Sequence, residues 1–298
     1  MDFYINWRDA WTEDGSRRQC KLEDAMLSNR LAILAVLAMC ILPAVAQAQD
    51  GSTAPFTAAA VSADQHKPMK FHRVRIDGSV ESENWSGYAV TGTGFTKAQG
   101  SWTISAVSCS TTPNTYAAFW VGIDGYSSDT VEQTGTIGYC SGTTAIYYAW
   151  YEFYPAASVE ITSVPVTPGD VISAEVSYSG TEFTTTITNQ TTGSSFSKTG
   201  RVRGAARSSA EWIAEAPCCT SSGGILPLSD FGVSSFGEDY TGISDTNFAT
   251  ETSTSGAISA FGSDVQEIIM VSSSGAEEAV PSALTSDGTS FQVTWKSE

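Results

Sequence analysis

Histidine is almost absent from this sequence. The 298 residues contain two, His66 and His72, and both precede the part of the chain that reads as a folded domain. A Ser-His-Asp or Cys-His catalytic arrangement is therefore excluded from that domain, because each needs an imidazole base. A zinc site with histidine ligands is excluded on the same ground.

Basic residues are also scarce. The chain has 15 Lys and Arg against 32 Asp and Glu, which gives a net charge of −17 at neutral pH. From residue 79 onward six basic residues stand against 23 acidic ones, so this part alone accounts for the net charge. A body this acidic repels nucleic acid and anionic membranes, and we expect neither as a partner. The acidic composition favours a protein that acts at low pH, where carboxyl groups lose their charge and repel one another less. The alternative is that it only keeps the protein soluble.

Helical spacing and phosphate loops are missing as well. Residues 201–210 are the best helical candidate, and no glycine-rich loop follows a strand and opens a helix. Asp124-Gly125 is typical of a turn, but no full calcium-binding loop surrounds it. We therefore expect neither a metal nor an organic cofactor.

The first 78 residues differ from the rest. Residues 26–48 have a basic start, an apolar run too short for a membrane span, and the small-x-small motif Ala46-Gln47-Ala48, which is typical of a secretory signal peptide. Residues 1–25 are polar and indicate an over-extended start. Residues 49–78 read as a propeptide or linker before a single domain at 79–298. We expect a secreted, extracellular monomer, free of the membrane after signal cleavage.

The segment 49–78 is basic and holds both histidines together with Lys67, Lys70, Arg73 and Arg75. Beside an acidic body, such a segment docks at neutral pH and is released when the carboxylates protonate. A passive, disordered leader explains the same composition. Both interpretations stay open.

Four cysteines remain after signal removal, and an even count in an exported protein predicts disulfides. Four cysteines allow three pairings. We favour Cys109–Cys140, with Cys218 and Cys219 either bonded to each other or left as thiols.

Strand signals follow one another from residue 84 onward, separated by turn residues. Ten or more strands in one domain predict an all-β fold, an antiparallel two-sheet β-sandwich. The expected strands are 85–91, 99–105, 116–123, 130–139, 145–154, 171–178, 183–189, 211–215, 265–271, 279–284 and 290–296.

The polar residues left for chemistry are carboxyls and carboxamides. A buried Glu with a raised pKa can take a proton from water and later return it to a leaving group. A Gln amide can donate a hydrogen bond to a developing oxyanion, and it has no proton to lose in acid. Such a pair can hydrolyse an amide at a pH where a histidine base is already protonated.

Six segments carry a resemblance to a known family. They appear in the family's order and interleave polar with aromatic or branched residues. On these segments the sequence resembles the glutamic peptidases, the eqolisin family of pepstatin-insensitive acid endopeptidases. The segments are Asn84-Trp85-Ser86-Gly87-Tyr88, Trp120-Val121-Gly122-Ile123-Asp124-Gly125, Gln133-Thr134-Gly135, residues 148–155, Pro168-Gly169-Asp170 and Ala210-Glu211-Trp212-Ile213.

The resemblance implies a concanavalin A-like jelly roll and polypeptide substrates. It implies that Glu211 activates water and protonates the leaving amine, while Gln133 stabilises the oxyanion. Glu215 lies four residues beyond Glu211 and is the main competitor for the acid role, and Glu132 points to the opposite face. Four further positions match the substrate cleft or its support: Trp85, Asp124, Trp150 and Glu152.

Two other classes of function remain. Glu152 and Glu211 are a possible carboxyl pair for a glycoside hydrolase, since sandwiches with aromatic clefts also break sugars. A non-catalytic carbohydrate-binding module predicts saccharide binding without turnover of any polymer.

Overall fold

A computed structural model describes residues 66–219, 223–252 and 254–298. The segments predicted as an over-extended start (1–25) and a signal peptide (26–48), and most of the segment 49–78, lie outside the described residues. Within the described part of the chain, no helix has both the length and the apolar character to cross a membrane.

The described residues form 18 strands and two short helical segments. These are β1 Phe71–Val74, β2 Val80–Ser82, β3 Trp85–Thr91, β4 Lys97–Thr103, β5 Tyr116–Ile123, β6 Val131–Ser141, β7 Thr144–Tyr154, β8 Val159–Ile161, β9 Val171–Ser179, β10 Glu182–Asn189, β11 Ser194–Gly200, β12 Ser209–Glu215, β13 Val233–Phe236, α1 Glu238–Thr241, β14 Phe248–Thr250, β15 Ser255–Ala257, the 3₁₀ segment Ile258–Asp264, β16 Val265–Val271, β17 Glu277–Pro281 and β18 Phe291–Trp295.

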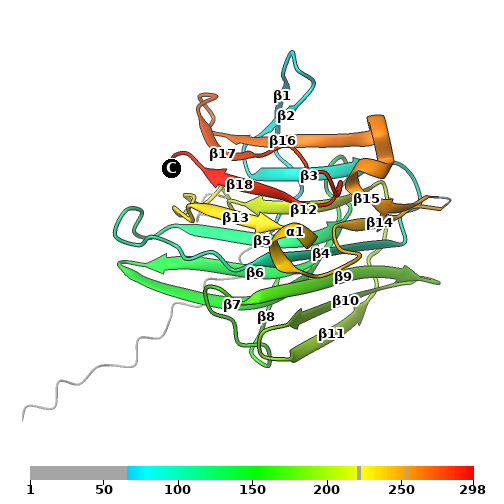
Figure 1. The fold of residues 1–298 in the computed structure, drawn as a ribbon, viewed down its shortest axis with the longest axis horizontal. Coiled ribbons are helices and arrows are strands. Elements are labelled where there is room, and N and C mark those ends of the chain that lie inside the picture. The colour runs from blue at the N-terminus through cyan, green and yellow to red at the C-terminus, as the bar shows by residue number, and fades with distance from the viewer. Residues whose placement is uncertain (1–65, 220–222, 253) are drawn as a thin grey trace, which may run out of the picture. The chain divides into compact units, whose positions relative to one another are not determined.

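Strand pairing follows two runs. The first is β16-β3-β12-β5-β6-β7-β8, and the second is β18-β13-β4-β9-β10-β11. Strand β17 pairs with both β16 and β18 and so joins the runs. All pairs between named strands are antiparallel except β2 with β16. Figure 1 shows β12 lying between β3 and β5, although both of these strands come much earlier in the sequence.

Alternation along the first run produces two apolar clusters. One face of β3, β5 and β12 packs with residues of β4, β9 and β10 into the larger cluster, which includes Trp102 and Trp212. The opposite face forms a smaller cluster dominated by Trp85, Trp120 and Trp150. Period-two alternation puts polar residues of the same strands beside these tryptophans, so this second face is where a site can form.

The all-β, antiparallel prediction is confirmed, and three expected strands (85–91, 116–123 and 265–271) have the observed bounds. The helix considered for residues 201–210 is wrong. The chain turns at Gly204, whose φ is 86°, and Arg207 has a φ of 52°, so neither can sit inside an α-helix. The division into two sheets of a jelly roll stays a prediction here.

The favoured disulfide between Cys109 and Cys140 is present. It ties the loop after β4 to the end of β6, across a sequence separation of 31 residues. Cys218 and Cys219 are bonded to each other, the first of the two alternatives.

Glu132 is a carboxyl held among apolar side chains. It pairs with Ile123, a residue of the larger cluster, so it points away from the face of Gln133, as expected. Burial, followed by repulsion from Asp124, raises the pKa of Glu132 to about 9. An acid whose pKa is higher in the folded state stabilises the fold below its unfolded pKa of about 4.5, and that stability is lost as the pH rises toward 9.

We expect Glu132→Gln to flatten the pH dependence of stability, because Gln keeps the shape of the neutral acid and does not ionise. In the wild type, Glu132 makes the free energy of unfolding decrease with rising pH, by up to about 1.4 kcal/mol per pH unit between about pH 5 and 8. We expect this contribution to be absent in Glu132→Gln. Denaturant titrations at several pH values measure it, with the exposed Glu160→Gln as control. Equal slopes in wild type and Glu132→Gln would contradict the assignment.

Candidate active site

Antiparallel register brings three predicted residues into one row across the first run. Glu211 pairs with Gly122 of β5, Gly122 with Gln133 of β6, and Gln133 with Glu152 of β7. Directly opposite residues point to the same face of a sheet. Gly122 keeps the row open, because a Cβ there would lie 2.9 Å from the Trp120 ring and 3.2 Å from the Gln133 Cβ.

Strand β12 carries a second glutamate on the same face. Glu215 lies four residues after Glu211, so period-two alternation points both side chains to one side. The Trp120 indole Nε1 donates to Glu215 Oε2 at 2.8 Å, and the Glu215 side chain is fully buried. Trp120 packs edge-on against Trp85, with ring centroids 4.9 Å apart, which holds the donating indole in place.

Gln133 and Glu152 form the opposite side of the site. Gln133 Nε2 donates to Glu152 Oε2 at 2.9 Å, and both side chains are fully buried. The contact orients the Gln133 amide, because the NH₂ group must face the carboxyl. The other side-chain oxygens of Gln133, Glu152 and Glu215 are buried without a hydrogen-bond partner among the described residues.

One residue of the segment before β1 joins the two sides. Gln133 Nε2 donates to the His66 carbonyl oxygen at 2.8 Å, and the His66 backbone N–H donates to Glu152 Oε2 at 3.1 Å. The imidazole Nδ1 lies 2.7 Å from Glu215 Oε2. The His66 ring stacks on Trp150 with centroids 3.5 Å apart and an interplanar angle of 6°. Gln133, Glu152, Glu215 and Trp150 therefore meet around a single peptide residue.

Burial sets the electrostatics of the site. Loss of water raises the pKa of Glu152 well above its ordinary value, and the nearby Glu215 raises it further. Burial also raises the pKa of Glu215, against the opposing effects of His66 and Trp120. Two neighbouring carboxyls with raised pKa values can hold and exchange protons in the acid range.

Glu211 occupies a different environment from the one expected for the catalytic acid. No hydrogen bond joins it to Gln133, and both carboxyl oxygens are buried without a hydrogen-bond partner among the described residues. Its pKa is raised well above the ordinary value by burial, and Asp124 and Glu132 add repulsion. The register places Glu211 and Gln133 on one face, but the carboxyl that meets the same residue as Gln133 is that of Glu215.

The other expected residues divide by role. Trp150 and Glu152 contact His66 directly, whereas Trp85 acts through its packing on Trp120. The Asp124 carboxylate accepts hydrogen bonds from the backbone N–H groups of Arg207 and Ser208, at 2.7 and 2.9 Å. Asp124 therefore fixes the chain just before β12 begins, and it positions that strand without reaching His66.

Two residues of the site, Trp120 and His66, were not predicted from the sequence. Trp120 lay inside a quoted motif but had no assigned role, and its indole donor is visible only once β5 and β12 are paired. His66 was assigned to a basic leader with no specific contact. The one feature of the sequence that could have drawn attention to His66 is that the chain has only two histidines.

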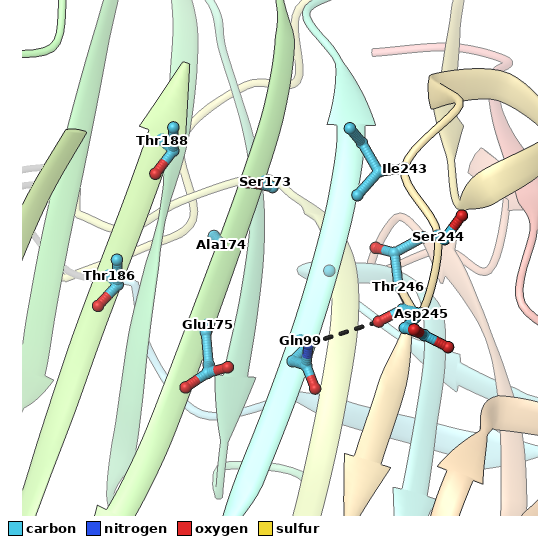
Figure 2. Close-up of a pocket in the computed structure, with 11 residues that line it drawn as sticks. Gln99, Ser173, Ala174, Glu175, Thr186, Thr188, Ile243, Ser244, Asp245 and Thr246 are labelled. Carbon is cyan, nitrogen blue, oxygen red and sulfur yellow. Dashed lines mark hydrogen bonds between the residues drawn. The ribbon is translucent and has the colours of Figure 1, made fainter. Parts of the chain in front are cut away.

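A separate shallow groove lies on the outer face of β4, β9 and β10 (Figure 2). Its lining mixes polar and apolar residues, with Glu175 and Thr186 on the strands and Ile243 and Asp245 on the loop that precedes β14. Gln99 Nε2 donates to the Asp245 carbonyl oxygen at 3.4 Å, and Figure 2 shows this contact. None of the predicted site residues lines this groove.

Curated relatives match much of the chain. Aspergillopepsin-2 from Aspergillus niger is 31% identical over 191 residues, which cover 55% of this chain and 66% of that protein. Scytalidopepsin B from Scytalidium lignicola is 34% identical over 134 residues, 44% of this chain and 50% of that protein. The matched regions thus span about two thirds and one half of these relatives' lengths.

Solved structures share the fold. Scytalido-glutamic peptidase with a transition state analog inhibitor superposes with a TM-score of 0.60 and 24% identity, covering 72% of this chain and 98% of that one. Aspergilloglutamic peptidase from Aspergillus niger gives a TM-score of 0.52 and 26% identity, covering 61% and 99%.

The profile of the Peptidase A4 family matches residues 83–294, a span that includes Gln133, Glu152, Glu211 and Glu215. This span is well over half of the 298 residues. The chain belongs to the Peptidase A4 family.

Proposed function

We propose that this chain is a secreted acid endopeptidase that hydrolyses peptide bonds with a water activated between Gln133 and Glu215. The observation that carries the proposal is that both side chains contact one peptide residue. Gln133 binds the His66 carbonyl oxygen at 2.8 Å, while Glu215 lies 2.7 Å from the side chain of that residue. A carbonyl held by an amide donor beside a buried carboxyl is the arrangement that hydrolysis by water requires.

The reaction proceeds in two steps on these two side chains. In its ionised form, which the hydrogen bond from the Trp120 indole favours, Glu215 takes a proton from water as the water oxygen bonds to the peptide carbonyl carbon, and the carbonyl oxygen becomes an oxyanion. The Gln133 N–H group donates to that oxyanion. Glu215 then returns its proton to the amine nitrogen as the C–N bond breaks, and a carboxylic acid and an amine leave.

The neighbouring residues support this pair. Glu152 orients the Gln133 amide and accepts from a substrate backbone N–H, as it does from that of His66 at 3.1 Å. Trp150 offers a flat apolar face for a substrate side chain. Trp85 and Asp124 act on the positions of Trp120 and β12. Polypeptides are the proposed substrates, and the steps use side chains alone.

Export and the finer fold are part of the proposal. The disulfide Cys109–Cys140 suits an oxidising compartment, and residues 26–48 have the pattern of a signal peptide. A concanavalin A-like sandwich of two sheets is supported by the two runs of strands, whose residues share the larger apolar cluster.

Glu215→Gln and Glu211→Gln form a matched pair on one strand and one face. We expect Glu215→Gln to lower the rate of peptide hydrolysis in acid by about 10²–10⁴-fold, because the proton-transfer group is lost. Glu211→Gln should retain activity within about tenfold, since Gln replaces a carboxyl that burial keeps neutral. Digestion of an acid-unfolded protein at about pH 3–4, with pepstatin present, measures both. The reverse ranking would return the acid role to Glu211.

Gln133→Ala tests the oxyanion donor. We expect a loss of about 10²–10³-fold in kcat, because one preorganised hydrogen bond to the transition state disappears. Gln99→Ala, in the outer groove of Figure 2, is the control and should leave kcat unchanged. A loss below about tenfold in Gln133→Ala would remove this residue from the role.

A further inference from the structure

The groove on the outer face of β4, β9 and β10 takes no part in the proposed chemistry. Ala98 of β4 and Val176 of β9 face the larger apolar cluster, so period-two alternation points their neighbours Gln99 and Glu175 outward. The cleft lies on the other face of β5, β6 and β12, beside the smaller cluster. The groove and the cleft are therefore on opposite sides of the larger cluster, and a ligand in one leaves the other free.

Strand register arranges polar side chains in rows along the groove. Gln99 of β4 pairs with Glu175 of β9, and Glu175 pairs with Thr186 of β10. In a neighbouring row Ser173 pairs with Thr188. Directly opposite residues share a face, and neighbouring strands are roughly 5 Å apart. The floor therefore presents a carboxamide, a carboxylate and hydroxyl groups at regular spacing.

The loop that precedes β14 forms the facing wall (Figure 2). Asn247 fixes this wall from behind, because its Oδ1 accepts from the Ser101 backbone N–H at 3.2 Å and its Nδ2 donates to the Thr289 carbonyl oxygen at 2.8 Å. Gln99 adds its hydrogen bond to the Asp245 carbonyl oxygen. A wall that is ordered before a ligand arrives lowers the entropic cost of binding.

Hydrogen-bonding groups of the groove are free for a ligand. Thr246 on the wall is 2% exposed, and its Oγ1 has no hydrogen-bond partner among the described residues. A buried hydroxyl without a partner costs free energy, which a ligand hydroxyl removes. Thr186 donates its own hydrogen to Ser197 Oγ at 3.1 Å and keeps lone pairs that can accept. Lys97 Nζ lies 3.3 Å from Glu175 Oε2, and Glu175 Oε1 has no partner in the described part of the chain.

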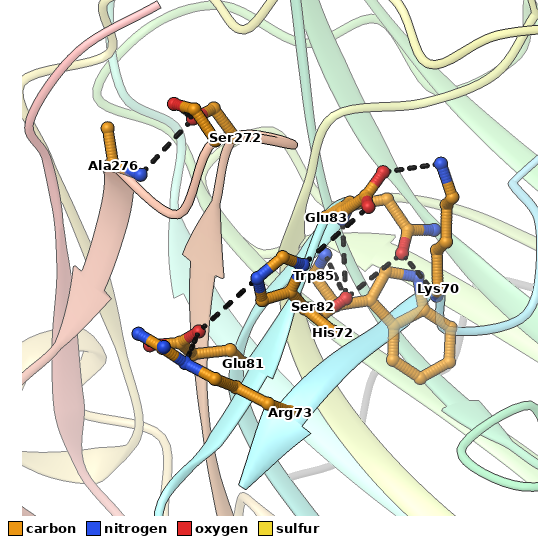
Figure 3. A network of polar contacts seen from close by, with 11 residues as sticks. Lys70, His72, Arg73, Glu81, Ser82, Glu83, Trp85, Ser272 and Ala276 are labelled. Carbon is orange, nitrogen blue, oxygen red and sulfur yellow. Dashed lines mark hydrogen bonds and ion pairs between the residues drawn. The ribbon is translucent and has the colours of Figure 1, made fainter. Parts of the chain in front are cut away.

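The polar cluster on β1 and β2 provides a contrast (Figure 3). Arg73 and Arg75 each place Nε 2.7 Å from the Glu81 carboxylate, and Lys70 pairs with Glu83. Hydrogen bonding to Arg73 holds the pKa of Glu81 below its ordinary value. The cations of that cluster satisfy its carboxylates, whereas the groove keeps unpaired acceptors and a buried hydroxyl.

Charge narrows the class of ligand. Glu175 and Asp245 line the groove and the chain is strongly acidic, so an anion is repelled. An organic cation has to compete with Lys97, which already pairs with Glu175. A neutral ligand that both donates and accepts hydrogen bonds fits the free groups best.

The shape and the mixed lining narrow the class further. Ile243 on the wall and Gly100 on the floor offer apolar contact beside the polar groups. A sugar ring has C–H groups on its faces and O–H groups at its edge, which matches both kinds of contact. The groove has a volume of about 190 Å³, below the about 300–1,000 Å³ of sites that enclose a drug-sized ligand. It therefore suits a single ring of a longer chain.

We propose that this groove is a binding site for a neutral polysaccharide. Glu175 and Thr186 contact the hydroxyl groups of one sugar ring from the strands, and Thr246 contacts them from the loop. The site goes beyond the proposed function and does not rest on it. Because the cleft stays free, a chain held here by a polysaccharide remains open to polypeptides.

Titration of the full chain with cellotetraose, laminaritetraose and chitotetraose tests the site by calorimetry. We expect the wild type to bind at least one of these neutral sugars at concentrations up to about 10 mM. Thr246→Val should weaken that binding about three- to tenfold, because one hydrogen bond is lost, and Glu175→Ala about tenfold or more, because a charged acceptor is lost. The control Thr185→Val changes a buried threonine next to Thr186 on the inner face of β10 and should bind as the wild type does.

Three results would overturn the site. They are no binding of any of the three sugars by the wild type, equal affinities of the wild type and both groove variants, and binding of spermidine in place of the sugars. The last result would make the groove a site for organic cations.

Amide NMR spectra of the wild type locate the sugar without any variant. The tetraose that binds most tightly should shift the amide signals of Gly100, Glu175 and Thr246 and leave those of Gln133 and Glu215 in place. Shifts confined to Gln133 and Glu215 would put the sugar in the cleft and contradict the proposal. Neither measurement involves peptide hydrolysis, so a negative result here leaves the proposed function as it stands.

Discussion

The pairing register of β12, β5, β6 and β7 is the constraint on which the cleft depends. It aligns Gly122 with Gln133 and Glu152, and it aligns Gly135 with Trp120 and Trp150. A Cβ at Gly135 would lie 2.3 Å from the Phe119 carbonyl oxygen, so only glycine lets the strands pair there. A slip of one residue would turn every polar side chain of one strand into the apolar core. The register therefore sets which groups can meet.

Burial of uncharged carboxyls is the second constraint. It explains why low pH favours both the folded state and the proposed chemistry. Removal from water raises the pKa of Glu132, Glu152, Glu211 and Glu215 alike. These groups are least costly to bury when protonated. Low pH thus reduces the electrostatic cost of the folded state.

Much of the fold follows from local pattern. Alternation of apolar and polar residues predicted the central strands, because each has one face in a core. The short strands β13, β14 and β15 were not predicted, because three or four residues are too few to show the two-residue alternation of a strand. The false helix at 201–210 arose from helix-forming residues. Tertiary contacts decided otherwise, because Asp124 binds the backbone N–H groups of Arg207 and Ser208 and fixes a non-helical turn just before β12.

By itself the sequence determined the chemical inventory: almost no histidine, a Gln and several Glu on alternating strands, an acidic body and a basic leader. It also determined that Glu211 and Glu215 share a face, because the side-chain period of a strand is two. Only the tertiary structure decided which glutamate meets the residue that Gln133 binds. The two carboxyls lie roughly 13 Å apart along the strand, and Trp120, from a strand distant in sequence, donates to Glu215. The position of His66 was decided the same way, because its four contacts come from residues that only folding brings together.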